Sequence, residues 1–189
     1  GMFDVEEFVA SCRSALAEKP PELAVKELMA SVMSRPGDVE SALRTPTKGG
    51  ITTLHKSAEL TVLNIVWPPG MALYPHDHQL WAVIGLYGGR EDNTFFTRNK
   101  SETGLVRAGF KKLEAQDAVV LGQDAIHAVA NPGGGFTGAI HVYGGDFFTK
   151  PRSEWESESA EEVPYSVEHA MQAFAEANQR WVDQQGVSG

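Results

Sequence analysis

The residues best suited to chemistry are two histidines that stand two positions apart. His76 and His78 lie in the stretch from Gly70 to Glu91, just before an apolar, β-rich run that ends at Gly88-Gly89. Residues two apart in a β-strand point to the same face, so both imidazoles could hold one metal ion. The alternative is a surface loop that carries two incidental histidines.

A third ligand is needed, because a metal ion held tightly by protein takes at least three donors. The stretch from Gly122 to Asn131 contains His127, which would come from another strand. His127 is therefore the best candidate for the third ligand.

The two stretches together resemble the two-part motif of the cupins. The positions that match are Gly70, His76, His78, Gly122, His127 and Asn131. A typical cupin also has a glutamate four or five residues after the second histidine, where this chain has Ala82 and Val83. The resemblance implies a mainly β fold, a single cupin jelly roll (double-stranded β-helix), with three neutral histidines as the metal ligands.

Within the cupins, residues 50 to 150 resemble the thiol dioxygenases, meaning the cysteine dioxygenase group and its bacterial mercaptopropionate relatives. The shared elements are Pro75-His76-Asp77-His78, the continuation from Trp81 to Gly85, and the late His141-Val142-Tyr143. The resemblance implies an Fe(II)-dependent dioxygenase that uses O₂ to oxidise a small thiol to a sulfinate. Zinc, nickel and manganese stay open as alternative metals.

His141 and Tyr143 share one strand face by the period-two rule. In the thiol dioxygenases the equivalent residues form a hydrogen-bonded pair beside the metal. We therefore expect Tyr143 to donate a hydrogen bond to the substrate or an oxygen species, while His141 holds its orientation. The family often has a serine two residues before this histidine, and Ala139 stands there instead. Val83 excludes the Cys–Tyr cross-link of some members.

The same resemblance raises the question of how a substrate carboxylate would bind. The family commonly uses an arginine, or in some relatives a glutamine, on a strand before the first motif. The corresponding region, Ile51 to Lys56, has neither. The substitutes that the sequence offers are His55, Lys56, Arg90 and Arg98. His55 and His169 lie outside both motifs, and we interpret them as structural or surface residues.

Three neutral imidazoles would leave the +2 charge of the ion uncompensated, which favours an anionic co-ligand such as a thiolate or enolate. Coordination would lower the pKa of that acidic group. Two other functions stay open. One is a three-histidine cupin of different chemistry, such as diketone cleavage or isomerisation, and the other is a non-catalytic cupin that binds a small ligand.

The elements that must position these residues follow from periodicity. At 189 residues we expect one domain, residues 1–189,. Residues 3–48 read as helical, divided by Pro20-Pro21 and Pro36-Gly37 into two main helices and a short third from Val39 to Leu43. Residues 51–148 form the predicted β-barrel core. Its predicted strands are Thr52–His55, Leu60–Trp67, Met71–Tyr74, Gln79–Tyr87, Asn93–Arg98, Val106–Leu113, Ala118–Leu121, Ala125–Asn131 and Phe136–Tyr143.

The segment after Phe148 is acidic and reads as a solvated connector. A final helix is predicted for residues 166–183, capped by Ser166. Three of its apolar residues could pack on the barrel: Met171, Phe174 and Ala177.

Charge and composition limit the partners. Sixteen Lys and Arg against 25 Asp and Glu give a formal charge of −9, which disfavours nucleic acid and anionic membranes,. The single cysteine, Cys12, permits no disulfide within the chain and reads as a packed side chain,. No apolar run approaches the roughly 20 residues of a membrane span, so we expect a cytoplasmic protein. A homo-oligomer stays open.

Overall fold

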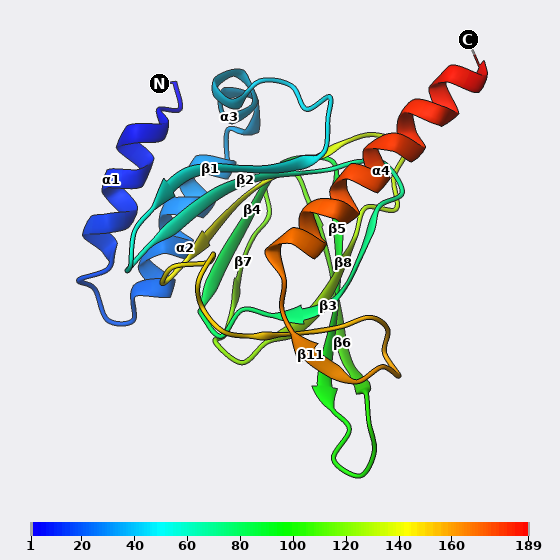
Figure 1. The fold of residues 1–189 in the computed structure, drawn as a ribbon. Coiled ribbons are helices and arrows are strands. Elements are labelled where there is room, and N and C mark those ends of the chain that lie inside the picture. The colour runs from blue at the N-terminus through cyan, green and yellow to red at the C-terminus, as the bar shows by residue number, and fades with distance from the viewer. Residues whose placement is uncertain (1, 189) are drawn as a thin grey trace.

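Three helices open the chain and pack together beside a β-sheet (Figure 1). A computed structural model describes residues 2–188. The helices are α1 (Val5–Ala15), α2 (Pro21–Met33) and α3 (Pro36–Leu43). The Asp4 carboxylate accepts a hydrogen bond from the Glu7 amide at 2.9 Å and so caps α1,. Pro21 and Pro36 begin α2 and α3, where a missing N–H does no harm,.

Across residues 2–188, eleven strands form two antiparallel sheets. The first sheet has the spatial order β1 (Gly50–Lys56), β2 (Thr61–Trp67), β9 (Thr137–Tyr143), β4 (Ala82–Gly88) and β7 (Ala118–Leu121). The second has the order β11 (Glu162–Pro164), β10 (Ser153–Trp155), β3 (Ala72–Asp77), β8 (Ile126–Ala130), β5 (Arg90–Arg98) and β6 (Leu105–Glu114). Strands β1 to β9 fall at the nine predicted positions, although β3 continues to Asp77 and β4 begins only at Ala82.

The strand order identifies the fold. The eight strands from β2 to β9 occupy the orders 2-9-4-7 in one sheet and 3-8-5-6 in the other. Two interlocked Greek keys produce this arrangement, which is the jelly roll, or double-stranded β-helix. The predicted fold class is confirmed, with helices at both ends of a mainly β chain.

The two faces of the first sheet pack against different parts of the molecule. On β9, Ile140 and Val142 pack in the cluster that includes Met29 and Met33 of α2, while Ala139 and Tyr143 face the barrel interior. Gly85 on β4 allows α2 to come close, because a Cβ there would lie 2.5 Å from the Met29 sulfur. Cys12 of α1 is buried in the same cluster, as predicted.

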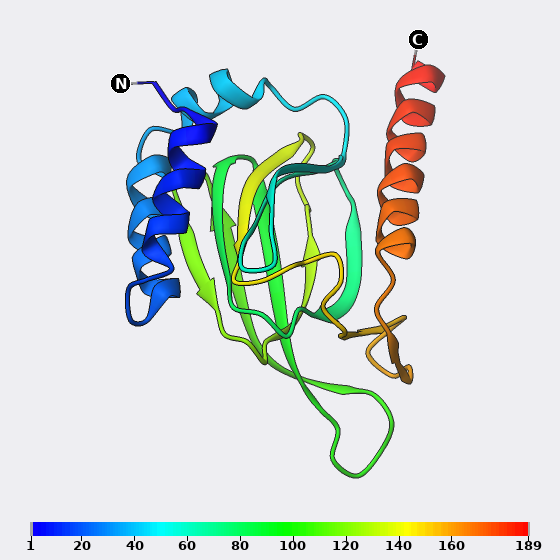
Figure 2. The same ribbon diagram turned by 60° about the vertical axis from the view of Figure 1, so that its left-hand side comes forward.

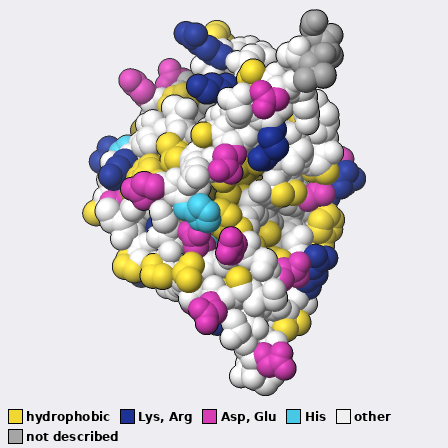
Figure 3. All heavy atoms as spheres, turned by 45° about the vertical axis from the view of Figure 1, so that its right-hand side comes forward, with side chains coloured by type: hydrophobic (Ala, Val, Ile, Leu, Met, Phe, Trp, Pro, Cys, Tyr) yellow, Lys and Arg dark blue, Asp and Glu magenta, His cyan; other side chains and the backbone are white. Residues whose placement is uncertain are grey.

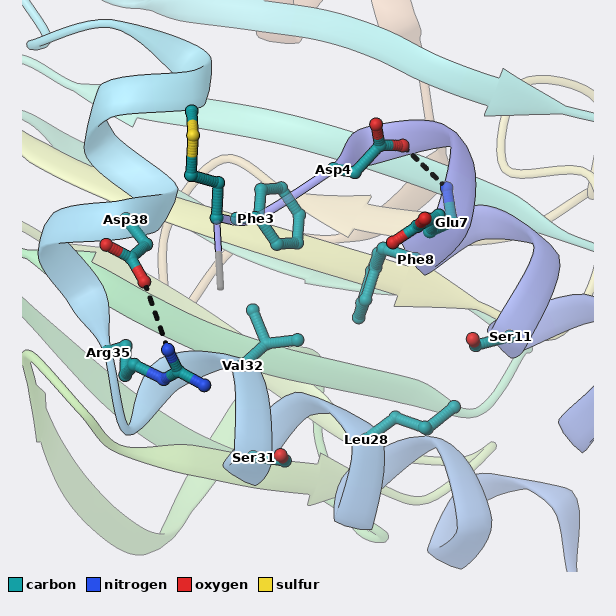
Figure 4. Close-up of a pocket in the computed structure, with 11 residues that line it drawn as sticks. Phe3, Asp4, Glu7, Phe8, Ser11, Leu28, Ser31, Val32, Arg35 and Asp38 are labelled. Carbon is teal, nitrogen blue, oxygen red and sulfur yellow. Dashed lines mark hydrogen bonds and ion pairs between the residues drawn. The ribbon is translucent and has the colours of Figure 1, made fainter.

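A groove of about 250 Å³ lies among the three N-terminal helices and the residues before α1 (Figure 4). Phe3, Phe8, Leu28 and Val32 line it with apolar surface, and polar side chains border it. All of its lining residues belong to residues 2–38. The groove is therefore separate from the histidines of the barrel.

The C-terminal helix α4 (Val167–Ser188) stands on the opposite side of the barrel from α1 and α2 (Figure 2). It continues beyond the predicted end at residue 183, and Gly189 lies outside the described residues. Phe174 and Ala177 pack with the barrel interior. Met171 does not, because it is 47% exposed.

The acidic segment after Phe148 is not a purely solvated connector, contrary to the prediction. It contains β10 and β11, and β10 pairs with β3. Trp155 and Glu154 are buried there, and the Glu154 carboxylate accepts hydrogen bonds from the Ser166 amide and from His169. These two hydrogen bonds explain how the carboxylate of Glu154 can be buried.

The surface shows no broad grouping of basic side chains on the face in Figure 3. Hydrophobic side chains gather near the middle of that face, with acidic ones around them. Within residues 2–188, no helix has the length and apolarity required to cross a membrane.

Candidate metal centre

Three histidines meet inside the barrel. His76 on β3 lies directly opposite His127 on β8, and His78 follows just past the end of β3. Their ring centroids are 4.7 to 5.1 Å apart, and one nitrogen of each ring lies within 4.8 Å of the others. All three side chains are buried. The structure thus brings together the three residues that the sequence analysis selected as metal ligands.

A local irregularity in β3 creates this alignment. The pairing of β3 with β8 shifts register between Leu73 and His76. Pro75 stands in that interval, and a proline has no N–H to donate to a ladder. The irregularity therefore falls where the sequence can tolerate it, and it sets His76 across from His127.

Hydrogen bonds orient two of the rings. His76 Nδ1 lies 3.0 Å from the Tyr74 carbonyl oxygen, and His127 Nδ1 lies 2.8 Å from Asn93 Oδ1. Both partners are acceptors, so each Nδ1 carries the proton and each Nε2 has a free lone pair. His127 Nε2 is buried and has no hydrogen-bond partner within residues 2–188. A buried nitrogen left in this state fits a metal ligand.

The electrostatics favour neutral rings. Burial lowers the pKa of His76 to about 4. Burial lowers the pKa values of His78 and His127 well below the usual value, and the neighbouring histidines act in the same direction. All three are therefore neutral at pH 7, the state in which imidazole binds a metal.

His141 and Tyr143 reach the same cavity from β9. Both are buried, and His141 Nδ1 lies 3.0 Å from the Tyr143 hydroxyl. The Tyr143 ring centroid is 5.0 Å from that of His78. Burial raises the pKa of Tyr143 well above its usual value, so the phenol keeps its proton. The structure therefore places a neutral phenol beside the histidine cluster.

Sequence reasoning missed Glu91, which is 0% exposed on β5. Its Oε2 accepts a hydrogen bond from Trp67 Nε1 at 3.1 Å and lies 3.6 Å from His141 Nε2. Its Oε1 accepts a hydrogen bond from Asn93 Nδ2 at 3.1 Å. The available signal was the spacing of Glu91 and Asn93, which places two polar residues on one face of a strand.

Arg152 was also missed. It is only 8% exposed, and its guanidinium lies 4.5 Å from the Phe147 ring centroid and 4.0 Å from that of Tyr165. Nη1 donates to the carbonyl oxygens of Phe147 and Lys150, whereas Nε and Nη2 have no partner within the described part of the chain. Arg152 lies in the acidic segment that the sequence analysis interpreted as a solvated connector, so its burial was not predicted.

The four residues considered for a substrate carboxylate lie elsewhere. Lys56 stacks on the Phe148 ring at 4.9 Å, Arg90 pairs with Asp92, and Arg98 pairs with Glu162. Neither they nor His55 line the cavity beside the three histidines. His169 is half-exposed and bonds to Glu154, in agreement with its interpretation as a structural or surface residue.

The cavity itself is small and mostly apolar. Its volume is about 20 Å³, which is room for about one water molecule,. Barrel strands supply most of the wall, and the C-terminal segment contributes Tyr165, Ala170 and Phe174. Phe147, which touches Arg152, lines it too.

Comparison with known proteins gives likenesses of shape for part of the chain. No family model matches the sequence. A protein from Bacillus halodurans has a TM-score of 0.49 at 14% identity, covering 66% of this chain and 85% of its own. A double-stranded β-helix protein from Klebsiella pneumoniae has a TM-score of 0.47 at 13% identity, covering 62% and 88%. An RmlC-like cupin family protein from Methanocaldococcus jannaschii has a TM-score of 0.45 at 12% identity, covering 55% and 85%. These values are too low to show membership of a family.

Proposed function

We propose that the chain binds one divalent metal ion, Fe(II), through His76, His78 and His127, and oxidises a small thiol with O₂ to a sulfinate. The observation that carries this proposal is the convergence of three neutral, buried imidazoles with no carboxylate among them. Imidazole is a suitable ligand for iron, as it is for zinc and nickel. In the balanced reaction, both atoms of O₂ enter the product, RSH + O₂ giving RSO₂H.

The charge of the ligand set supports an anionic substrate. The metal, when bound, supplies a Lewis-acidic centre that lowers the pKa of a thiol and brings it together with O₂. Three neutral ligands leave the full charge of the ion available to a thiolate, whereas a carboxylate ligand would cancel half of it.

The phenol of Tyr143 gives the cavity a hydrogen-bond donor. Because the pKa of Tyr143 is raised, the group stays protonated throughout the neutral pH range. His141 fixes the position of the hydroxyl through the 3.0 Å contact. We therefore assign Tyr143 the task of donating to negative charge that develops on the reacting substrate.

Arg152 extends the proposal to the rest of the substrate. A buried guanidinium with two unpaired donors favours an anionic partner, and a carboxylate can accept both donors at once,. Arg152 does not itself line the cavity, but its guanidinium contacts the rings of Phe147 and Tyr165, which do. A small thiol that also bears a carboxylate would pair with Arg152 once these two rings move aside.

Oxygen uptake tests the proposal. Protein loaded anaerobically with Fe(II) is mixed with cysteine, mercaptopropionate or cysteamine, and O₂ consumption and sulfinate are measured. We expect one sulfinate per O₂ with a carboxylate-bearing thiol and little turnover of cysteamine. Arg152→Gln should raise KM for the acid thiol and leave the weak cysteamine reaction unchanged. No O₂ uptake with any thiol would reject the proposal in favour of another three-histidine chemistry or a binding role.

A further inference from the structure

Glu91 is a negative charge buried without a Lys or Arg partner among the described residues. The basic side chain that approaches it is His141, whose Nε2 lies 3.6 Å from Glu91 Oε2. The adjacent Asp92, by contrast, pairs with Arg90 at 2.7 Å. A buried carboxylate is costly for a fold unless hydrogen bonds stabilise it, so its place inside the barrel needs a reason.

One set of contacts leads from Glu91 to a metal ligand. Glu91 Oε1 accepts a hydrogen bond from the Asn93 amide NH₂, which turns Asn93 Oδ1 toward His127 Nδ1. That acceptor fixes the proton of His127 on Nδ1 and leaves Nε2 free. Without the carboxylate, the Asn93 amide could turn over, and its NH₂ would face the N–H of His127.

The other set of contacts leads to the phenol. Glu91 Oε2 lies 3.6 Å from His141 Nε2, which is too far for a hydrogen bond, and His141 Nδ1 lies 3.0 Å from the Tyr143 hydroxyl,. Trp67 Nε1 donates to the same carboxylate oxygen and helps to fix it. Ala139 has no hydroxyl to offer His141. Glu91 is therefore the polar side chain nearest to His141 on the side away from Tyr143.

We propose that Glu91 is a positioning residue that fixes the ring of His127 through the Asn93 amide. This inference rests on the metal site of the proposed function.

The decisive comparison is Glu91→Gln against Asp92→Asn. Both changes remove one negative charge from β5, but only the first alters the contacts with Asn93 and His141. A carboxylate accepts from Asn93 Nδ2 with one oxygen and from Trp67 Nε1 with the other, whereas glutamine has a single acceptor oxygen. Its NH₂ would therefore face one of these two donors. Co(II) titration of the metal-free protein, followed by absorption, measures the affinity without requiring thiol turnover.

A second variant separates the two sets of contacts. Asn93→Ser breaks the link between Glu91 and His127 and leaves the approach to His141 in place. It also keeps the inference testable if Glu91→Gln does not fold. Imidazole ¹⁵N NMR of the metal-free protein reports directly which nitrogen of His127 carries the proton.

We expect Glu91→Gln and Asn93→Ser to weaken Co(II) binding about 10- to 100-fold, as loss of an outer hydrogen-bond partner typically does. The Nδ1–H tautomer of His127 should be lost in both, and Asp92→Asn should match the wild type in both measurements. Co(II) affinity within twofold of wild type in both variants, with the tautomer unchanged, would overturn the positioning role. A wild-type protein that binds neither Co(II) nor Fe(II) would instead overturn the proposed function, and this inference with it.

Discussion

Acid should destabilise the metal-free protein through its buried histidines. The pKa of His76 is about 4 in the folded protein, against about 6.5 in the unfolded chain,. Below pH 6.5 the His76 side chain binds a proton in the unfolded chain but stays neutral in the folded protein. The free energy of unfolding therefore falls as the pH falls. The loss begins near pH 6.5 and is complete below about pH 4.

The magnitude follows from the shift. A difference of 2.5 pKa units corresponds to about 3 kcal/mol for His76 alone, of which about 2 kcal/mol is lost between pH 6.5 and 4.5,. The pKa values of His78 and His127 are lowered as well, so their contributions have the same sign. These losses are a large part of the stability of an ordinary domain.

Urea unfolding in the presence of a chelator, at half-unit steps between pH 7.5 and 4.5, measures this loss. His76→Gln removes one of the three groups and should flatten the pH dependence by about 2 kcal/mol over the range from 6.5 to 4.5. An equal pH dependence in His76→Gln and wild type would refute the reasoning, since carboxylates titrate alike in both.

Three further predictions concern single residues. His127→Ala should lose bound metal on dialysis, as measured by elemental analysis, and full retention would mean that the third ligand is a different residue. Tyr143→Phe should keep its metal and fold but turn over substrate about 10²- to 10³-fold more slowly, and unchanged turnover would show that the phenol is not catalytic. Gly85→Ala should destabilise the protein by about 1–3 kcal/mol in urea unfolding, because the new methyl group would overlap Met29 in a filled core,. Gly88→Ala on the same strand meets no atom within 4 Å, and an equal loss there would contradict this explanation.

Most elements could be predicted because their signals are local. The prolines at positions 21 and 36 begin helices, and the apolar runs between Gly, Pro and Asn became strands β1 to β9. The three histidines could be found because their spacing fits paired strands. His78 lies just past the end of β3 rather than within it, and this difference of one residue leaves the cluster intact.

The remainder depends on contacts between distant parts of the chain. Glu91 reads like any other acidic residue of a strand end, and only Trp67, Asn93 and His141 together reveal that it is buried. Arg152 stands in an acidic, polar segment, and only the packing of β10 on β3 brings it inside. Periodicity describes which face of an element is covered, but it does not identify the partner that covers it.

The cavity beside the histidines has a volume of about 20 Å³, room for about one water molecule and less than the thiols proposed as substrates need,. A substrate must therefore open the wall to enter, and a sulfinate, with two more oxygen atoms, must open it further to leave. Tyr165, Ala170 and Phe174 are the wall residues that the C-terminal segment supplies, so we expect them to move first. Motions of this kind take microseconds to milliseconds and often limit turnover. Solvent viscosity should then slow product release while leaving the chemical step unchanged.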